Sequence, residues 1–262
     1  MISPILLANS TTLANLGSST VAEAPQNPEL SPARSRDNAW TDIALTLPIF
    51  LLYHAGVVFL PIRNAADIVT SQLVELAERS MFFYLTLTAS VGAVVIVLFL
   101  LLGQKRALRW QRFAMITVEG VVYAVAMRVV AGYVVGQLRL DAGAPTHLGL
   151  YAGFVMSLGA GFYEELIFRV GIFGLLGQLA MLALVASPAP WKKFLFWLGW
   201  GMLTSLLFSG WHHLGELGEP FTLSAFVFRW VSGLVFTLIF ATRGFATAVW
   251  THTLYDIWVL VL

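Results

Sequence analysis

Two adjacent carboxylates and an arginine stand inside a long apolar run in the stretch Gly161-Phe-Tyr-Glu-Glu-Leu-Ile-Phe-Arg-Val170. An ionisable group at membrane depth costs about 3 kcal/mol or more, so its presence there is by default a sign of function. Glu165 and Arg169 are four residues apart and share one face of a helix, where they can pair. Glu164 is turned by about 100° from that face. We interpret the stretch as a working carboxylate beside a structural ion pair; the alternative is a buried salt bridge with a neighbour that reaches toward the interface.

The whole chain has the composition of a membrane protein. Of its 262 residues, 58% are hydrophobic and only 11% are charged, and the mean hydropathy is +0.81. A soluble domain is usually about 25% charged, so we predict a polytopic protein of the lipid bilayer. The net charge of +1 argues against nucleic acid as a partner. The sequence has no cysteine, which excludes disulfides, thiolate metal sites and a cysteine nucleophile.

Apolar runs along the chain predict an all-α bundle of about eight transmembrane helices. A membrane span needs about 20 mainly apolar residues, and most of the runs are roughly that long. The expected spans are Trp40–Ile62, Met81–Gly103, Phe113–Val135, His147–Phe168, Gly171–Ala186, Phe194–His212, Leu223–Ala241 and Phe245–Leu262. The fifth is short and interrupted by glycine. Small residues in the fourth, such as Gly153, Gly159 and Gly161, favour close helix packing.

The segments outside the spans divide the chain. Residues 1–38 are polar and lack periodicity, so we expect a disordered tail, and residues 39–262 are expected to form one transmembrane domain with the catalytic motifs in 147–262. The connection Arg63–Ser80 has mixed charge and some amphipathic spacing, which favours a position along the membrane interface. Four cations within residues 104–112 indicate a cytoplasmic loop, and we expect a bacterial plasma membrane.

Polar groups in three of the spans are predicted to meet. At 1.5 Å per residue, Glu164 lies about 25 Å into its helix, His212 about 28 Å, and His252 and Asp256 about 13 and 20 Å. If the fourth, sixth and eighth spans run in the same direction, these groups converge in one half of the membrane. This arrangement requires the fifth span to cross the bilayer fully.

The chemistry is concentrated in three elements. They are Glu164-Glu165-x-x-x-Arg169, Phe208-Ser-Gly-Trp-His212 and His252-Thr-Leu-Tyr-Asp256. Two histidines and carboxylates from separate helices could polarise a water, with a glutamate as base and the histidines orienting it and holding the oxyanion. They could instead ligate zinc, which lowers the pKa of a bound water. Both routes end in hydrolysis.

These elements resemble the EExxxR, FxxxH and HxxxN/D motifs of the CPBP family (CaaX-protease and bacteriocin-processing, also called Abi) of intramembrane proteases. The resemblance covers residues 147–262. It implies that Glu164 activates the attacking water together with His212, that Glu165 and Arg169 brace the site, and that Phe208 packs the pocket. His252 and Asp256 would hold the oxyanion or position the substrate. The implied substrate is a membrane protein or peptide, and a divalent metal such as zinc is a possible cofactor.

Three alternatives stay open at this level. An ionised Asp256 cannot donate to an oxyanion, so it is either protonated or orients His252, and we favour orientation of His252. His213 competes with its neighbour His212, although the spacing from Phe208 favours His212. The alternative functions are a non-enzymatic membrane protein, such as an immunity or scaffold factor, and a transporter that uses Glu164 and Glu119 for protons.

Overall fold

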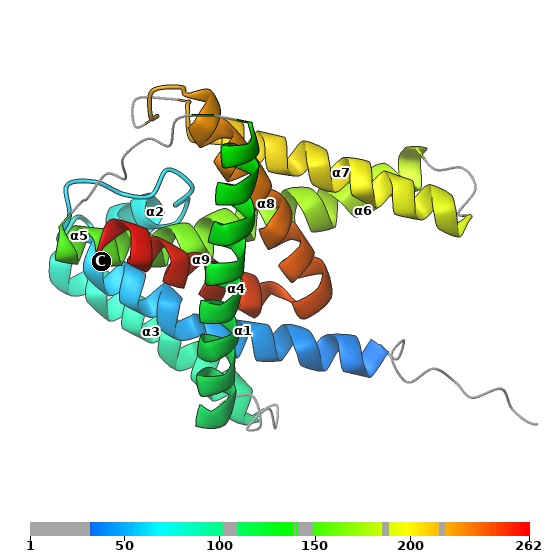
Figure 1. Ribbon diagram of the computed structural model, residues 1–262. Coiled ribbons are helices and arrows are strands. Elements are labelled where there is room, and N and C mark those ends of the chain that lie inside the picture. Colours follow the sequence, from blue (N-terminus) through cyan, green and yellow to red (C-terminus); the bar gives the residue numbers. More distant parts are fainter. Residues whose placement is uncertain (1–31, 102–108, 139, 141–148, 185–188, 215–217) are drawn as a thin grey trace, which may run out of the picture.

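The computed structural model describes residues 32–101, 109–138, 140, 149–184, 189–214 and 218–262, which form helices and no strand. The predicted all-α fold is therefore confirmed. Its elements are α1 Pro32–Val57, α2 Thr70–Leu76, α3 Met81–Leu101, α4 Trp110–Gln137, α5 Leu150–Gly159, α6 Gly177–Leu184, α7 Pro190–Trp211, α8 Leu223–Arg243 and α9 Phe245–Leu260, with two π-helical segments, η3 Ala160–Glu164 and η4 Leu166–Leu176, between α5 and α6 (Figure 1).

Six helices in the described part of the chain are long and apolar enough to cross a membrane. They correspond to α1 from Trp40 onward, α3, α4, the continuous helix Leu150–Ala183, α7 and α8. The last of the predicted spans forms α9, which has 16 residues and is shorter than the others. The structure thus has fewer spans than the eight predicted, mainly because the fourth and fifth predicted spans form one helix.

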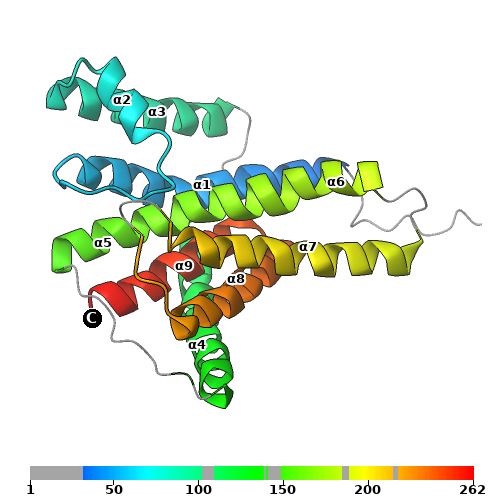
Figure 2. The ribbon, with the colours of Figure 1, turned by 90° about the horizontal axis from the view of Figure 1, so that it is seen from above.

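The fourth and fifth predicted spans are one helix. Leu150–Ala183 runs for 34 residues through α5, η3, η4 and α6 without a break, as Figure 2 shows. The predicted division between Phe168 and Gly171 was wrong, because Gly171 and Gly174 continue the π-helical winding. Glycine is common within membrane helices and does not end them where packing and an apolar environment support the backbone.

This fusion changes how the polar groups meet. The segment after Glu164 does not turn back, so α7 returns alongside η4 and α6 in the opposite direction (Figures 1 and 2). Its C-terminal end reaches the middle of the long helix, where η3 lies. Helix α9 packs against α5 and η3. Convergence occurs as predicted, but the fourth predicted span does not run in the same direction as the sixth.

Close contact between α9 and the long helix depends on Gly161. A Cβ atom on Gly161 would lie 2.0 Å from the hydroxyl oxygen of Thr253 and 2.9 Å from its backbone nitrogen. Real Cβ atoms do not approach backbone so closely, so only glycine lets α9 pass at this point. A Cβ atom on Gly153 would come similarly close to the α9 C-terminus, and one on Gly159 to the Tyr53 ring. The predicted use of small residues in helix packing is confirmed, and it brings the third motif to the first.

The structure describes part of the predicted segments outside the spans. Helix α1 begins at Pro32, so it includes residues expected in the tail, while residues 1–31 lie outside the described residues. Most of the basic loop at 104–112 also lies outside them. The connection between the first two spans contains the short helix α2 and, before it, the α1–α2 loop of residues 58–69. That loop turns toward the bundle interior at Asn64, which is only 9% exposed.

Candidate active site

The two glutamates lie in the π-helical part of the long helix. Glu164 ends η3, and Glu165 is the single residue between η3 and η4. Both residues are buried, with exposed fractions of 6% and 0% for the whole residue. π-helical turns inside a helix occur often at functional sites, because they redirect side chains. Here both carboxylates point into the bundle rather than toward lipid.

Glu165 forms a buried ion pair with Arg169, on the shared helix face that the sequence predicted. Arg169 Nε lies 3.2 Å from Glu165 Oε2, and the arginine side chain is 1% exposed. Arg169 Nη2 also donates to the carbonyl oxygen of Gly233, at 3.3 Å. The guanidinium lies over the rings of Phe208 and Phe236, with Cζ 4.2 and 5.2 Å from the ring centroids. These contacts tie the long helix to α7 and α8.

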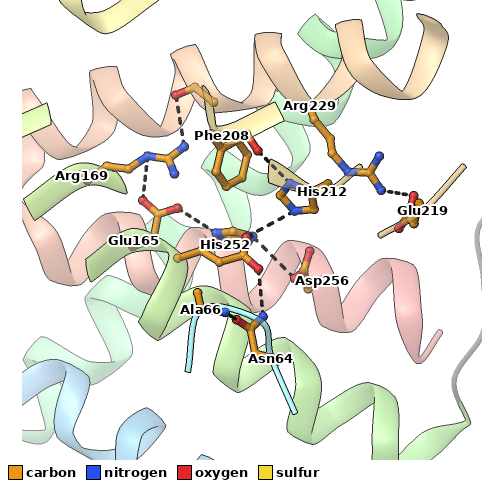
Figure 3. A network of polar contacts seen from close by, with 12 residues as sticks. Asn64, Ala66, Glu165, Arg169, Phe208, His212, Glu219, Arg229, His252 and Asp256 are labelled. Carbon is orange, nitrogen blue, oxygen red and sulfur yellow. Dashed lines mark hydrogen bonds and ion pairs between the residues drawn. The ribbon is translucent and has the colours of Figure 1, made fainter. Parts of the chain in front are cut away.

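Glu165 also fixes the imidazole of His252. The Nδ1–H group of His252 donates to Glu165 Oε1 at 2.8 Å (Figure 3). The imidazole stacks on Phe236, with centroids 4.5 Å apart and an angle of 19° between the planes. Asp256 Oδ2 lies 3.6 Å from Nε2, which is longer than a hydrogen bond. The carboxylate at hydrogen-bond distance from His252 is therefore Glu165, and not Asp256 as we expected.

Glu164 presents its two oxygens to different neighbours. Oε1 accepts a hydrogen bond from Asn64 Nδ2 at 2.9 Å. Oε2 faces two imidazoles, with Nε2 of His212 at 3.4 Å and Nε2 of His252 at 3.9 Å. The Oε2 atom has no hydrogen-bond partner among the described residues. One oxygen is held, and the other is free to act between two histidines.

His212 directly follows α7 and is held by that helix. Its Nδ1–H group donates to the carbonyl oxygen of Phe208 at 2.8 Å, which leaves Nε2 to face Glu164. Phe208 packs edge-on against the His212 ring, with centroids 4.9 Å apart. The His212 side chain is 21% exposed, against 8% for Glu164, so this edge of the site is the more open one. The seven predicted site residues, Glu164, Glu165, Arg169, Phe208, His212, His252 and Asp256, thus lie in one cluster.

Other candidates lie outside this cluster. Nδ1 of His213 is hydrogen-bonded to the carbonyl oxygen of Glu219 at 3.1 Å, and its ring packs on Phe221. His212 rather than His213 is therefore the residue beside Glu164. Glu119 forms an ion pair with Arg243, and the two side chains are 24% and 52% exposed.

The histidine and carboxylate side chains of the cluster are potential metal ligands by type. In the described part of the chain, no group of three or more histidine, aspartate or glutamate side chains is arranged to hold one. The described residues therefore do not fit a metal centre in this arrangement.

Two residues of the site were not found from the sequence. Asn64 belongs to the α1–α2 loop, which we expected to lie along the interface and not over a glutamate. Phe236 lies on the inward face of α8 and is one of 19 phenylalanines in the chain. Neither residue carries a charge or stands in a motif with the others. The only sequence signal was weak, namely a polar loop directly after an apolar span.

Residues 146–258 match the family described as Type II CAAX prenyl endopeptidase Rce1-like. The matched segment contains all three motifs, and the family predicted from them is confirmed. No curated protein and no solved structure matches the chain. Together with the six apolar helices, the match identifies an integral, multi-pass membrane protein. The bacterial plasma membrane remains a prediction.

Proposed function

Residues 146–258 are an Rce1-like domain of the CPBP family, and on this premise we propose a glutamate- and histidine-based endopeptidase mechanism within the membrane. The family indicates intramembrane protease activity of the CAAX type. We propose which residues of this chain carry out this activity and which class of substrate they cleave. The substrate is a peptide that is associated with the membrane, cleaved in or near the bilayer.

The pair of Glu164 and His212 supports the proposal most directly. Because His212 donates its Nδ1–H to the Phe208 carbonyl, its neutral ring presents a lone pair at Nε2. Ionised Glu164 presents lone pairs at Oε2, only 3.4 Å away. A water molecule that donates one hydrogen to each atom would satisfy both acceptors. In that position it is activated by general-base catalysis, with Glu164 taking the proton as the water oxygen attacks the peptide carbonyl.

His252 is suited to the charge that develops on the carbonyl oxygen. Its Nδ1–H is committed to Glu165, and its Nε2 points toward the same region as Glu164 Oε2. As an imidazolium it would donate Nε2–H to the tetrahedral oxyanion, in a site where apolar walls strengthen the interaction. Asp256, 3.6 Å from Nε2, would balance that charge. Arg169 and Phe208 act indirectly, by holding Glu165 and the two imidazoles in place.

The test uses a matched pair of glutamates in apolar helices. We expect Glu164→Gln to lower the rate of cleavage of a fluorogenic, farnesylated CAAX peptide by about 100-fold or more, because general-base catalysis is lost. Glu119→Gln makes the same change in a glutamate that pairs with Arg243 outside the cluster, and it should cleave normally. Correct insertion is checked by size-exclusion chromatography in detergent. Normal cleavage by Glu164→Gln, or an equal loss in both variants, would refute the mechanism.

The same pair addresses the transporter alternative. A transporter that uses both acids for protons should lose function in both variants and should yield no cleaved peptide. The observed pairing of Glu119 with Arg243, rather than with the cluster around Glu164, favours the peptidase.

A further inference from the structure

The α1–α2 loop contributes a side chain to the site from outside the family-matched segment. Asn64 lies 100 residues before Glu164, and its Nδ2 donates to Glu164 Oε1 at 2.9 Å (Figure 3). It is the one direct hydrogen bond to this carboxylate from the described residues. Residues 146–258 alone would therefore leave Glu164 without it.

The orientation of the Asn64 amide is set by its other partner. The backbone N–H of Ala66 donates to Asn64 Oδ1 at 2.8 Å. An N–H group can only donate, so Oδ1 must face Ala66 and the NH₂ group must face Glu164. The reverse orientation would bring two donors together at Ala66 and two acceptors together at Glu164. The Asn64 amide therefore donates a hydrogen bond to the Glu164 carboxylate.

The loop that carries Asn64 is held firmly. Tyr53 OH donates to Asp67 Oδ2 at 2.7 Å, and it accepts from the Asn64 backbone N–H at 3.4 Å. Asp67 Oδ1 accepts from the backbone N–H groups of Val69 and Thr70 at the start of α2. The Asp67 N–H in turn donates to the Asn64 carbonyl. Both sides of Asn64 are thus tied to α1 and α2.

We propose that Asn64 is a positioning residue, which holds Glu164 Oε1 so that Oε2 alone faces His212 and His252. A neutral amide suits this role, because it donates one hydrogen bond without placing a positive charge on the carboxylate. Without the bond, the Glu164 side chain could rotate and its Oε2 would leave the pair of imidazoles. The inference rests on the proposed function of Glu164 as the base.

Two substitutions of Asn64 separate positioning from simple support of the loop. Asn64→Ala removes both side-chain bonds. Asn64→Asp keeps the size and an oxygen for the Ala66 N–H, but it places an acceptor against Glu164. If Asn64 only supported the loop, Asn64→Asp would be the milder change. If it positions Glu164, Asn64→Asp must be the more severe one.

The measurement is steady-state cleavage of the farnesylated CAAX peptide in detergent, per amount of folded protein. We expect Asn64→Ala to lower kcat about 10- to 100-fold, because a misplaced catalytic group costs about that much. KM should stay within about twofold, and kcat of Asn64→Asp should fall below that of Asn64→Ala. Arg63→Gln is the control, because Arg63 lies in the same loop but is exposed and bonds Ser71 of α2 rather than a site residue, so kcat should be unchanged.

The outcomes distinguish this inference from the proposed function. Cleavage by Asn64→Asp equal to or above that by Asn64→Ala, or a loss that lies mainly in KM, would overturn the positioning role. The same holds if both variants cleave normally while Glu164→Gln is inactive. If Glu164→Gln itself cleaves normally, the proposed function fails, and this inference fails with it.

Discussion

Replacing Arg169 with methionine isolates the buried ion pair without leaving a large cavity. The change removes the cation 3.2 Å from Glu165, the bond to the Gly233 carbonyl and the contact with the Phe208 ring. Glu165 would remain with no exposed surface and with His252 as its partner. Breaking a buried pair in this way costs about 3–5 kcal/mol, because an uncompensated charge stays behind.

The expected loss is large enough to measure by thermal unfolding. For a domain of this size, 1 kcal/mol corresponds to about 2–4 °C in Tm, so Arg169→Met should lower Tm by about 6–20 °C. The nine tryptophans provide an intrinsic fluorescence signal in detergent. The double variant Arg169→Met with Glu165→Gln removes both charges and keeps an acceptor for His252. It should regain at least half of the lost Tm, since no unpaired charge remains.

Two results would refute this account of the pair. One is a loss of less than about 2 °C in Arg169→Met, which would mean that the guanidinium contributes little to stability. The other is a double variant no more stable than the single one, because the damage would then come from lost packing rather than from the unpaired carboxylate.

Three further predictions concern packing, the choice of histidine and the entry into α9. Gly161→Ala should destabilise the fold by about 1–3 kcal/mol, because its Cβ would collide with Thr253; thermal unfolding measures this. His213→Ala should leave peptide cleavage within about twofold, because its ring contacts the 219–226 region rather than Glu164. Asp42→Ala should lower stability by about 1 kcal/mol, because Asp42 Oδ2 accepts from the Phe245 N–H at the start of α9.

Each of these three predictions is paired with a control variant and with a result that would contradict it. Gly199→Ala places a Cβ where nothing lies within 4 Å, so it should not destabilise; equal Tm values for it and Gly161→Ala would contradict the packing argument. His212→Ala should abolish cleavage, and a normal rate there with a loss in His213→Ala would reverse the assignment. Asp42→Asn keeps an acceptor, so it should be milder than Asp42→Ala; the reverse order would exclude capping.

The pairing within the motifs could be predicted from the sequence, because residues four apart share one face of a helix. Glu165 and Arg169 pair at four residues, as predicted, and a π-helical segment that begins after Glu165 does not separate them. His252 and Asp256 also share a face, but the distance between them is 3.6 Å, because Glu165 takes the Nδ1 side of the imidazole. Spacing within one helix predicts neighbours; it does not predict which neighbour from another helix comes closer.

The break between the fourth and fifth predicted spans was wrong for a physical reason. Gly171 and Gly174 lower helix propensity in water, where a freed backbone can bond solvent. In an apolar bundle the backbone has no such alternative, so its groups stay bonded within the helix. The mainly apolar run of 34 residues is therefore one helix and not two.

Asn64 and Phe236 could not be predicted as site residues from sequence motifs. Each acts through a contact with a different helix, Asn64 with Glu164 and Phe236 with His252. Neither contact follows from periodicity or charge, because both depend on how α1, α8 and α9 pack around the long helix. Such residues become visible only when the arrangement of the helices is known.

The length of the helix Leu150–Ala183 has a consequence for where cleavage occurs. At the α-helical rise of 1.5 Å per residue its 34 residues would extend about 50 Å, and its π-helical turns make it somewhat shorter, while the hydrocarbon core of a bilayer is about 30 Å thick. A helix this much longer than the core lies oblique to the membrane normal or pushes the lipid outward. The height of Glu164 above the bilayer centre is therefore governed by inclination as well as by its place in the chain. Lipid acyl length should shift the position along a peptide at which hydrolysis takes place.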